Sequence, residues 1–348
     1  MSSDDLRMKR KIQKLGSSTL AVTLPAEWAR EQGLEKGDEL VVQRDESSGS
    51  LLVVPDTPAE TEATATIDVA SLDPESVRRA ILAQYVLGRQ LIEVESDGPI
   101  GPPIFEAITE TERRLMGLGV VEEGIDTVAI RCSVDPGDFE LPTLMDRLWR
   151  TEATMRSEAV EALLSSDTDL AERAIGRQRQ VEKLFYLFLR LVFTTYRNPR
   201  LNESVGLETG FPLIGYRSVA QDVVLMAGAA RDLADDVIDA GGVALDAETQ
   251  ELLTEVATAL EDAATATRQA VTNPTTTATS EGREALATFA SHADRAQEHL
   301  ESARPEPLLA LQRILLALRR SADHAEDSLD VATHFAFHST GAVETNGV

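Results

Sequence analysis

The sequence has little cysteine and no long hydrophobic run. Its single cysteine, Cys132, excludes an intrachain disulfide and a cysteine-rich zinc site, and we expect it to be a small buried residue. The first residues, MSSDDLRMKRK, contain no apolar segment of a signal peptide, and the most apolar later stretch, LFYLFLRLVF, is short and carries Arg190. We therefore expect a cytoplasmic protein that is not embedded in a membrane. Because 43% of the 348 residues are hydrophobic, the chain can build two or three globular cores.

The sequence also lacks the signs of a catalytic site. No motif pairs a Ser or Cys nucleophile with a base, and the five histidines all lie in the last 57 residues. Gly88, Gly98 and Gly101 do not have the spacing of a phosphate-binding loop. We expect the protein not to be an enzyme.

Lysine is scarce, and the chain is strongly acidic. Asp and Glu number 59 against 33 Lys and Arg, for a net charge of −26, which is typical of a halophilic protein whose surface repulsion is screened by salt. Residues 1–54 carry a net charge of only −1, and three of the five lysines lie there in KRKIQK, residues 9–14. This run indicates either a patch for an anionic partner such as a nucleic-acid backbone or a solvated arm.

Residues 10–55 alternate between apolar and polar residues, with one interruption. RKIQKL, the turn GSS and TLAVTL predict a hairpin, and AEWAREQGL after Pro25 predicts a short helix. KGDELVVQR and GSLLVVP predict a second hairpin around DESSG. Two hairpins and a short helix cannot bury their own apolar area in about 50 residues, so we expect a second copy of the chain to complete the fold.

Residues 7–55 resemble the swapped-hairpin DNA-binding domains of the AbrB, MazE and SpoVT type. The resemblance rests on the ordered string KIQKLGSSTLAVTLPAEWAREQGLEKGDELVVQ, and it implies an interlocked homodimer that binds promoter DNA. Many relatives have Arg where this chain has the two serines of the turn, which implies groove contacts that are weaker or absent, with the dimer retained. The positions that the resemblance assigns to DNA are Arg10, Lys11, Lys14, Ser17, Ser18 and Arg30.

The middle of the chain predicts a connector and a small α/β module. Residues 56–72 are rich in Thr, Ala and acidic residues, as in a linker. Residues 73–135 predict a helix, a strand, a second helix and two strands, which we interpret as a docking or dimerisation module.

The rest of the chain has helical periodicity and repeats itself. Residues 141–242 and 246–338 each predict three helices of similar length, which indicates a duplicated three-helix bundle. The whole chain is thus expected to be multi-domain: an N-terminal swapped-hairpin β module, a small α/β module, then a mainly α region.

The two predicted bundles resemble PhoU-type phosphate uptake regulators. LLALRRSADHAEDSLDVA and RQVEKLFYLFLR are similar to two helices of that family, and their combination with a swapped-hairpin domain resembles archaeal phosphate uptake regulators. The resemblance implies a regulator of phosphate uptake, acting on transcription of transport genes or on the transporter. Two alternatives stay open: an adaptor that binds a transporter ATPase subunit or a sensor kinase without binding DNA, and a metal-buffering protein.

The PhoU family binds clusters of transition-metal ions through E/D-x-x-x-D motifs, and a similar motif occurs here. Carboxylates and imidazoles follow one another on one face of the last predicted helix, where they could ligate Fe, Zn or Mn or form a solvated acidic face. In the first bundle Gly228 replaces the leading carboxylate, and a carboxylate there could instead pair with Arg231 or Arg320. The candidate ligands are Asp323, Asp327, Asp330, His334 and His338, with Glu182 and Asp294 as contributors and Asp232 and Asp235 as the incomplete first-bundle set.

Overall fold

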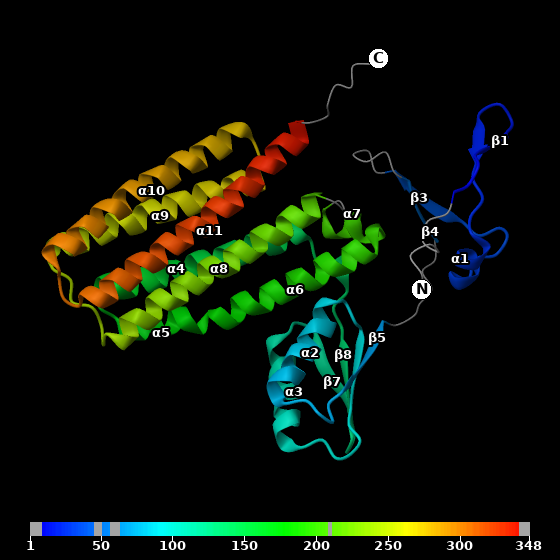
Figure 1. The fold of residues 1–348 in the computed structure, drawn as a ribbon, viewed down its shortest axis with the longest axis horizontal. Coiled ribbons are helices and arrows are strands. Elements are labelled where there is room, and N and C mark those ends of the chain that lie inside the picture. Colours follow the sequence, from blue (N-terminus) through cyan, green and yellow to red (C-terminus); the bar gives the residue numbers. More distant parts are fainter. Residues whose placement is uncertain (1–8, 45–50, 56–62, 208–210, 341–348) are drawn as a thin grey trace. The chain divides into compact units, whose positions relative to one another are not determined.

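The computed structural model describes residues 9–44, 51–55, 63–207 and 211–340 (Figure 1). The chain divides into two compact units, Met1–Glu62 and Ala63–Val348, and each has its own set of internal contacts. Among the helices in these ranges, none combines the length and apolar character that crossing a bilayer requires.

The N-terminal unit begins with a hairpin and a short helix. β1 (Gln13–Leu15) pairs antiparallel with β2 (Thr19–Ala21), and the tight turn between them places Gly16 at a φ of +82°. Pro25 then precedes α1 (Ala26–Glu31), where its missing N–H costs no hydrogen bond.

A second hairpin completes this unit. β3 (Leu40–Arg44) pairs antiparallel with β4 (Leu51–Pro55) in a two-stranded sheet separate from the first. The two predicted hairpins and the helix are therefore confirmed. The predicted DESSG turn, residues 45–49, lies outside the described residues.

No described residue of the N-terminal unit is buried. Sheets of two short strands have too little apolar area to form a core of their own. Large apolar side chains in and beside the strands are instead exposed: Ile12, Leu15, Leu20, Val22, Leu24, Val42, Leu51 and Leu52. The unit exposes the surface that a second copy would cover.

The second unit starts with a four-stranded sheet that carries two helices on one face (Figure 1). The strand order is β5-β6-β8-β7, with β5 parallel to β6 and the other pairs antiparallel. Asp73 caps the first helix by accepting hydrogen bonds from the backbone of Glu75 and Ser76. The elements are β5 (Thr64–Asp68), α2 (Pro74–Val86), β6 (Leu91–Glu95), α3 (Pro102–Arg114), β7 (Leu118–Glu123) and β8 (Thr127–Cys132).

β5 corrects the expected connector over residues 56–72. Residues 56–62 lie outside the described residues, but Thr64–Asp68 is an edge strand of the sheet. Ile67 and Val69 are buried, and with Ala65 they give the period of two that is typical of a half-buried strand. The sequence analysis did not recognise this alternation, because the segment is rich in Thr, Ala and acidic residues, as a linker is.

The helical region follows, and long helices in it lie side by side (Figure 1). α8 and α11 pack against each other, α4 packs on α8, and α9 and α10 pack on α11 and on each other. The buried residues of both helix sets form one continuous hydrophobic core. The elements are α4 (Leu141–Ser165), α5 (Thr168–Gly176), α6 (Gln178–Arg197), α7 (Asn202–Val205), α8 (Phe211–Asp239), α9 (Ala247–Thr272), α10 (Thr276–Ala303) and α11 (Leu308–Thr340).

The second of the three helices predicted within residues 141–242 is two helices in the structure. α5 ends at Gly176 and α6 begins at Gln178, with Arg177 between them. Glycine has low helix propensity, and Arg177 holds the corner by donating from Nε and Nη2 to the carboxylate of Glu158, each at 2.5 Å.

Buried Arg190 of α6 joins the α/β module to the helices. Its Nη1 donates to the backbone oxygens of Tyr85 at 2.7 Å and Arg89 at 2.9 Å, and its guanidinium lies 5.0 Å from the centre of the Tyr85 ring. Arg197 adds a hydrogen bond to the Leu87 oxygen. The guanidinium groups thus satisfy carbonyls at the C-terminal end of α2.

Candidate functional site

The first candidate site is the cationic segment of the N-terminal unit. Arg10 and Lys11 precede β1, Lys14 lies within it, and Ser17 and Ser18 form the turn that follows. All five side chains are exposed. Arg30, the sixth predicted position, lies apart in α1, where its Nε donates to the Ala26 oxygen.

The charge of this segment is opposite in sign to that of the chain. Residues 6–26 contain five cations and no carboxylate, within a chain of net charge −26. A hairpin with exposed Lys and Arg side chains can approach phosphate groups from one edge, and such contacts position a protein on nucleic acid without specifying its sequence.

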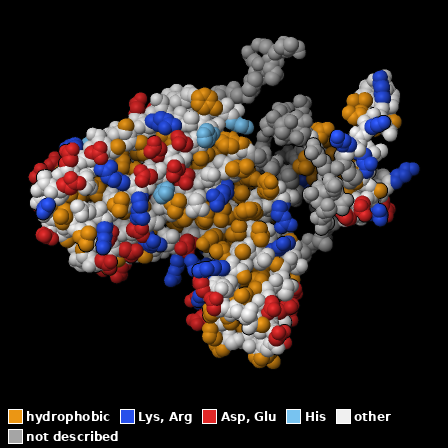
Figure 2. Space-filling view, in the orientation of Figure 1, with side chains coloured by type: hydrophobic (Ala, Val, Ile, Leu, Met, Phe, Trp, Pro, Cys, Tyr) orange, Lys and Arg blue, Asp and Glu red, His pale blue; other side chains and the backbone are white. Residues whose placement is uncertain are grey.

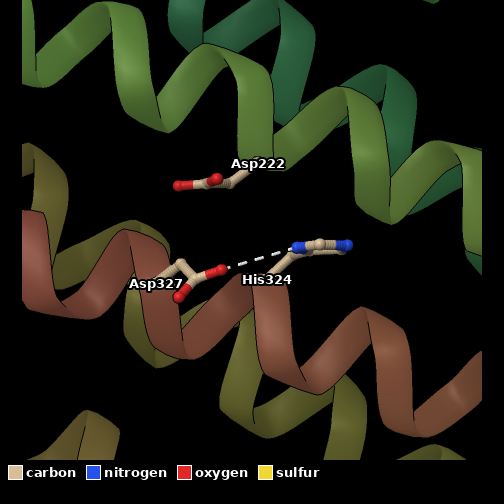
Figure 3. A group of neighbouring side chains, drawn as sticks. All are labelled: Asp222, His324 and Asp327. Atoms are coloured by element: carbon tan, nitrogen blue, oxygen red, sulfur yellow. Dashed lines mark ion pairs between the residues drawn. The ribbon is translucent and has the colours of Figure 1, made fainter.

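The second candidate site lies between α8 and α11. Asp222 of α8 faces His324 and Asp327 of α11, and donor atoms of the three side chains lie within 4.8 Å of one another (Figure 3). Within the described part of the chain, these residues form a group with the composition and spacing of a metal site. We call this group the α8–α11 cluster.

Short contacts order the cluster. His324 Nδ1 lies 3.6 Å from Asp327 Oδ2, and Ser328 donates its hydroxyl to Asp222 Oδ2 at 3.1 Å. His324 and Asp222 are partly buried, whereas Asp327 is exposed. His324 Nδ1 is inaccessible to solvent and makes no hydrogen bond, so the ring nitrogen facing the carboxylates is unsatisfied.

Burial dominates the electrostatics of Asp222. It raises the pKa of Asp222 to about 6, and the negative charge of Asp327 raises it further, while the Ser328 hydrogen bond and the charges of His324 and Arg217 oppose the shift. The fold thus holds a carboxylate where a positive charge beside it would be favourable.

The donor set fits a transition-metal ion. One imidazole nitrogen and two carboxylates are ligands that Zn, Fe and Mn accept, and three protein ligands leave further positions open. A cation here would occupy the unsatisfied side of His324 and neutralise Asp222.

Of the ligands predicted on α11, only Asp327 belongs to the cluster. Asp323 is exposed and outside it, and Asp330 pairs with Arg283 at 2.8 Å. His334 and His338 are exposed, and their rings lie 6.0 and 5.6 Å from that of Phe211. Asp323 lies on the exposed outer face of α11, whereas His334 and His338 lie beside Phe211 at the start of α8, outside the cluster.

The remaining predicted carboxylates are engaged by arginines. Glu182 pairs with Arg114 at 2.6 Å, and Asp294 with Arg319 at 2.8 Å. Burial opposes the charge of Asp232, but hydrogen bonds from Arg320 and Arg231 outweigh it and lower the pKa of Asp232. Asp235 lies 3.7 Å from Arg231. The contacts of Asp232 with Arg231 and Arg320 agree with the alternative in which a first-bundle carboxylate pairs with these arginines.

The sequence analysis missed Asp222 and His324. One signal for Asp222 was available, because it is the one charged residue in the mainly apolar stretch VAQDVVLM of residues 219–226. His324 is adjacent to the predicted Asp323, but its role depends on the packing of α8 against α11, which one sequence does not reveal.

Two family models match parts of the chain. Residues 13–61 match "Antidote-toxin recognition MazE, bacterial antitoxin", and residues 146–237 match the PhoU domain. No curated protein matches the chain. The PhoU match includes Asp222 and ends before α11.

The matches and the fold define a two-part regulatory architecture, with an N-terminal swapped-hairpin domain followed by PhoU-like helices. Both matched families are non-enzymatic regulatory domains. The PhoU match supports a place among regulators of phosphate homeostasis, and the MazE match suggests dimerisation and DNA binding.

Proposed function

We propose that the protein is a cytoplasmic, homodimeric transcriptional regulator that couples phosphate status to the genes of phosphate transport. The observation that carries this proposal is the exposed cationic segment of residues 9–21, which leads into the β1–β2 hairpin, in a chain of net charge −26 that also carries a PhoU-matched region. Cations that oppose the charge of the rest of the chain indicate an anionic partner.

A dimer would place two such hairpins together on DNA. Each phosphate neutralised by Lys or Arg releases counterions, so the logarithm of affinity falls with the logarithm of salt concentration by about 0.9 per contact. In concentrated salt this contribution is small. Specific binding would then depend on base contacts from the turn and strand.

DNA binding is tested by fluorescence anisotropy with promoter DNA at several salt concentrations. We expect Lys11→Ala with Lys14→Ala to weaken binding and to reduce the salt slope by about 0.9 for each lost phosphate contact. Lys36→Ala is a matched control, because Lys36 is an exposed lysine of the same unit outside the cationic segment. Equal DNA binding by wild type and the double variant would remove the DNA step and favour the adaptor.

The link to phosphate is tested by mapping genomic occupancy under phosphate plenty and starvation. If the protein is a transcriptional regulator, it should occupy DNA near phosphate transport genes, and this occupancy should change between the two conditions. An adaptor for a transporter ATPase subunit or a sensor kinase predicts no such occupancy.

A second candidate function, metal binding, is favoured by the α8–α11 cluster. Its support is the unsatisfied Nδ1 of His324 beside two carboxylates. We include Asp222, His324 and Asp327 in the proposed site. Elemental analysis of protein purified without chelator tests it, with bound Fe, Zn or Mn as the expected result.

A further inference from the structure

Residues 177–217 differ in charge and composition from the rest of the chain. They contain seven Lys and Arg against three Glu, a net charge of +4 in a chain of net charge −26. They also hold seven of the fifteen aromatic residues. Its described residues include α6, α7 and the start of α8.

Part of this aromatic and cationic segment is on the surface. Hydrophobic side chains gather over α6 and α8 on the face shown in Figure 2, and α6 packs against α8. Tyr196 is 63% exposed, Ile214 57% and Phe193 38%. With exposed Arg197 and Arg217 they define what we call the α6–α8 face.

On each helix, the exposed apolar and cationic side chains are three or four residues apart, which places them on the same side of the helix. Phe193 and Arg197 are four residues apart on α6, and Ile214 and Arg217 are three apart on α8. Apolar and cationic groups are therefore neighbours on the exposed side of each helix, and the two helices pack against each other. Tyr196 adds an aromatic ring with a polar tip.

We propose that the α6–α8 face docks on the surface of a membrane that contains anionic lipids, with α6 and α8 lying in the plane of the interface. Exposed aromatic and aliphatic side chains enter the boundary between headgroups and acyl chains, and arginines beside them bind lipid phosphates. The acidic remainder of the chain is repelled by the same surface, so charge selects this face for contact.

A second copy of the chain is a poorer occupant. A two-fold symmetric contact through this face would bring Arg197 and Arg217 towards the same residues of the partner, where like charges repel. A contact between this face and a different, acidic surface of another copy would not close into a dimer.

The proposal is tested by co-sedimentation of the full chain with vesicles. Vesicles of equal parts phosphatidylglycerol and phosphatidylcholine supply the anionic surface, and pure phosphatidylcholine is the neutral reference. We expect the partition coefficient to be at least tenfold higher on the anionic vesicles. Binding should weaken with added salt but persist in part, because salt screens the arginines and not the apolar contacts.

Two variants separate the apolar and cationic contributions. Tyr196→Ser with Ile214→Ser should lower partitioning on anionic vesicles about tenfold. Arg217→Gln should lower it about fivefold. Arg197 is left unchanged in this variant, because it also donates a hydrogen bond to the Leu87 oxygen. Leu309→Ser with Leu316→Ser is the matched control, because these α11 side chains are 62% and 58% exposed and lie outside the face. Circular dichroism melts confirm that each variant is folded.

Three results would overturn the proposal. The first is wild type that sediments with neither vesicle. The second is a control variant that loses as much binding as the Tyr196 and Ile214 variant. The third is a Tyr196 and Ile214 variant that still binds vesicles but has a different oligomeric mass by sedimentation equilibrium. That result would make the face an interface between copies of the chain.

Discussion

At the scale of single residues, α4 contains a buried ion pair in which burial disfavours the charge of a glutamate and an arginine beside it favours that charge. Glu152 is completely buried and Arg156 nearly so, with 2.9 Å between Arg156 Nε and Glu152 Oε1. Arg156 Nη1 also binds Glu261 at 2.5 Å, and Glu152 Oε2 has no partner. Burial raises the pKa of Glu152 although Arg156 opposes the shift. One guanidinium thus serves two carboxylates.

Removing this arginine should be strongly destabilising. Arg156→Met removes the only positive partner of buried Glu152, whose carboxyl must then stay an uncompensated charge or take up a proton, so the free energy of unfolding at pH 7 should fall by about 3–5 kcal/mol. Adding Glu152→Gln should recover part of the loss, because it removes the buried charge. Urea denaturation measures both variants.

The control for this pair is Arg295→Met, which removes a half-exposed partner of Glu255. Its cost should stay below about 1 kcal/mol. An Arg156→Met loss no larger than that of the control would show that the buried pair contributes little.

Asp222 gives a prediction that couples pH and metal. A carboxyl whose pKa rises from 3.8 to about 6 on folding stabilises the fold when protonated, and this contribution is lost as the pH rises through about 6. In chelator at pH 7, Asp222→Asn should therefore melt about 2 °C higher than wild type. Added Zn should raise the melting temperature of wild type and not of this variant.

Asp323→Asn is the matched control, since Asp323 is an exposed acid of the same helix outside the cluster. It should keep the shift with Zn. If Asp323→Asn loses the shift and Asp222→Asn retains it, the metal binds on the outer face of α11 instead.

At the scale of elements, the contact between α2 and α6 determines how the α/β module is held. Arg190 is buried and binds two backbone oxygens at the end of α2. Arg190→Leu should lower the free energy of unfolding by about 2–3 kcal/mol, because it removes two hydrogen bonds from a buried charged group and takes this donor from the Arg89 oxygen, while the Tyr85 oxygen keeps the N–H of Gly88. In this variant the rate of amide hydrogen exchange, relative to wild type, should rise more in α2 than in α8.

Arg179→Leu serves as the comparison, because Arg179 is an exposed arginine of the same helix. The rate of amide exchange in α2 of the Arg179→Leu variant should equal that of wild type. Equal exchange in the Arg190 variant would mean that other contacts hold the module.

Local sequence patterns predicted most elements, and long-range packing accounts for what they did not predict. The hairpins of the N-terminal unit and the long helices follow from period and turn residues. β5 was missed because a polar edge strand has the composition of a linker, and the break at Arg177 was missed because apolar periodicity continues across it. Of the α8–α11 cluster only Asp327 was predicted, since the partners come from helices about 100 residues apart.

At the scale of the whole molecule, the account depends on the incomplete N-terminal unit. Its described residues form two separate hairpins and a helix, and none of them is buried. Burying its exposed apolar side chains between two chains would remove them from water, and concentrated salt strengthens such burial while it screens repulsion between acidic chains. We therefore expect dimerisation through this unit to tighten with added salt.

The most direct test of this claim is sedimentation equilibrium of the full chain as a function of concentration, combined with fluorescence of Trp28. Trp149→Phe leaves Trp28 as the only tryptophan, so its emission reports on the N-terminal unit alone. The account predicts twice the chain mass of 37.8 kDa, with blue-shifted Trp28 emission that shifts to the red on dilution as the dimer dissociates. A 37.8 kDa species at micromolar concentration whose Trp28 emission is blue-shifted and independent of concentration would contradict it.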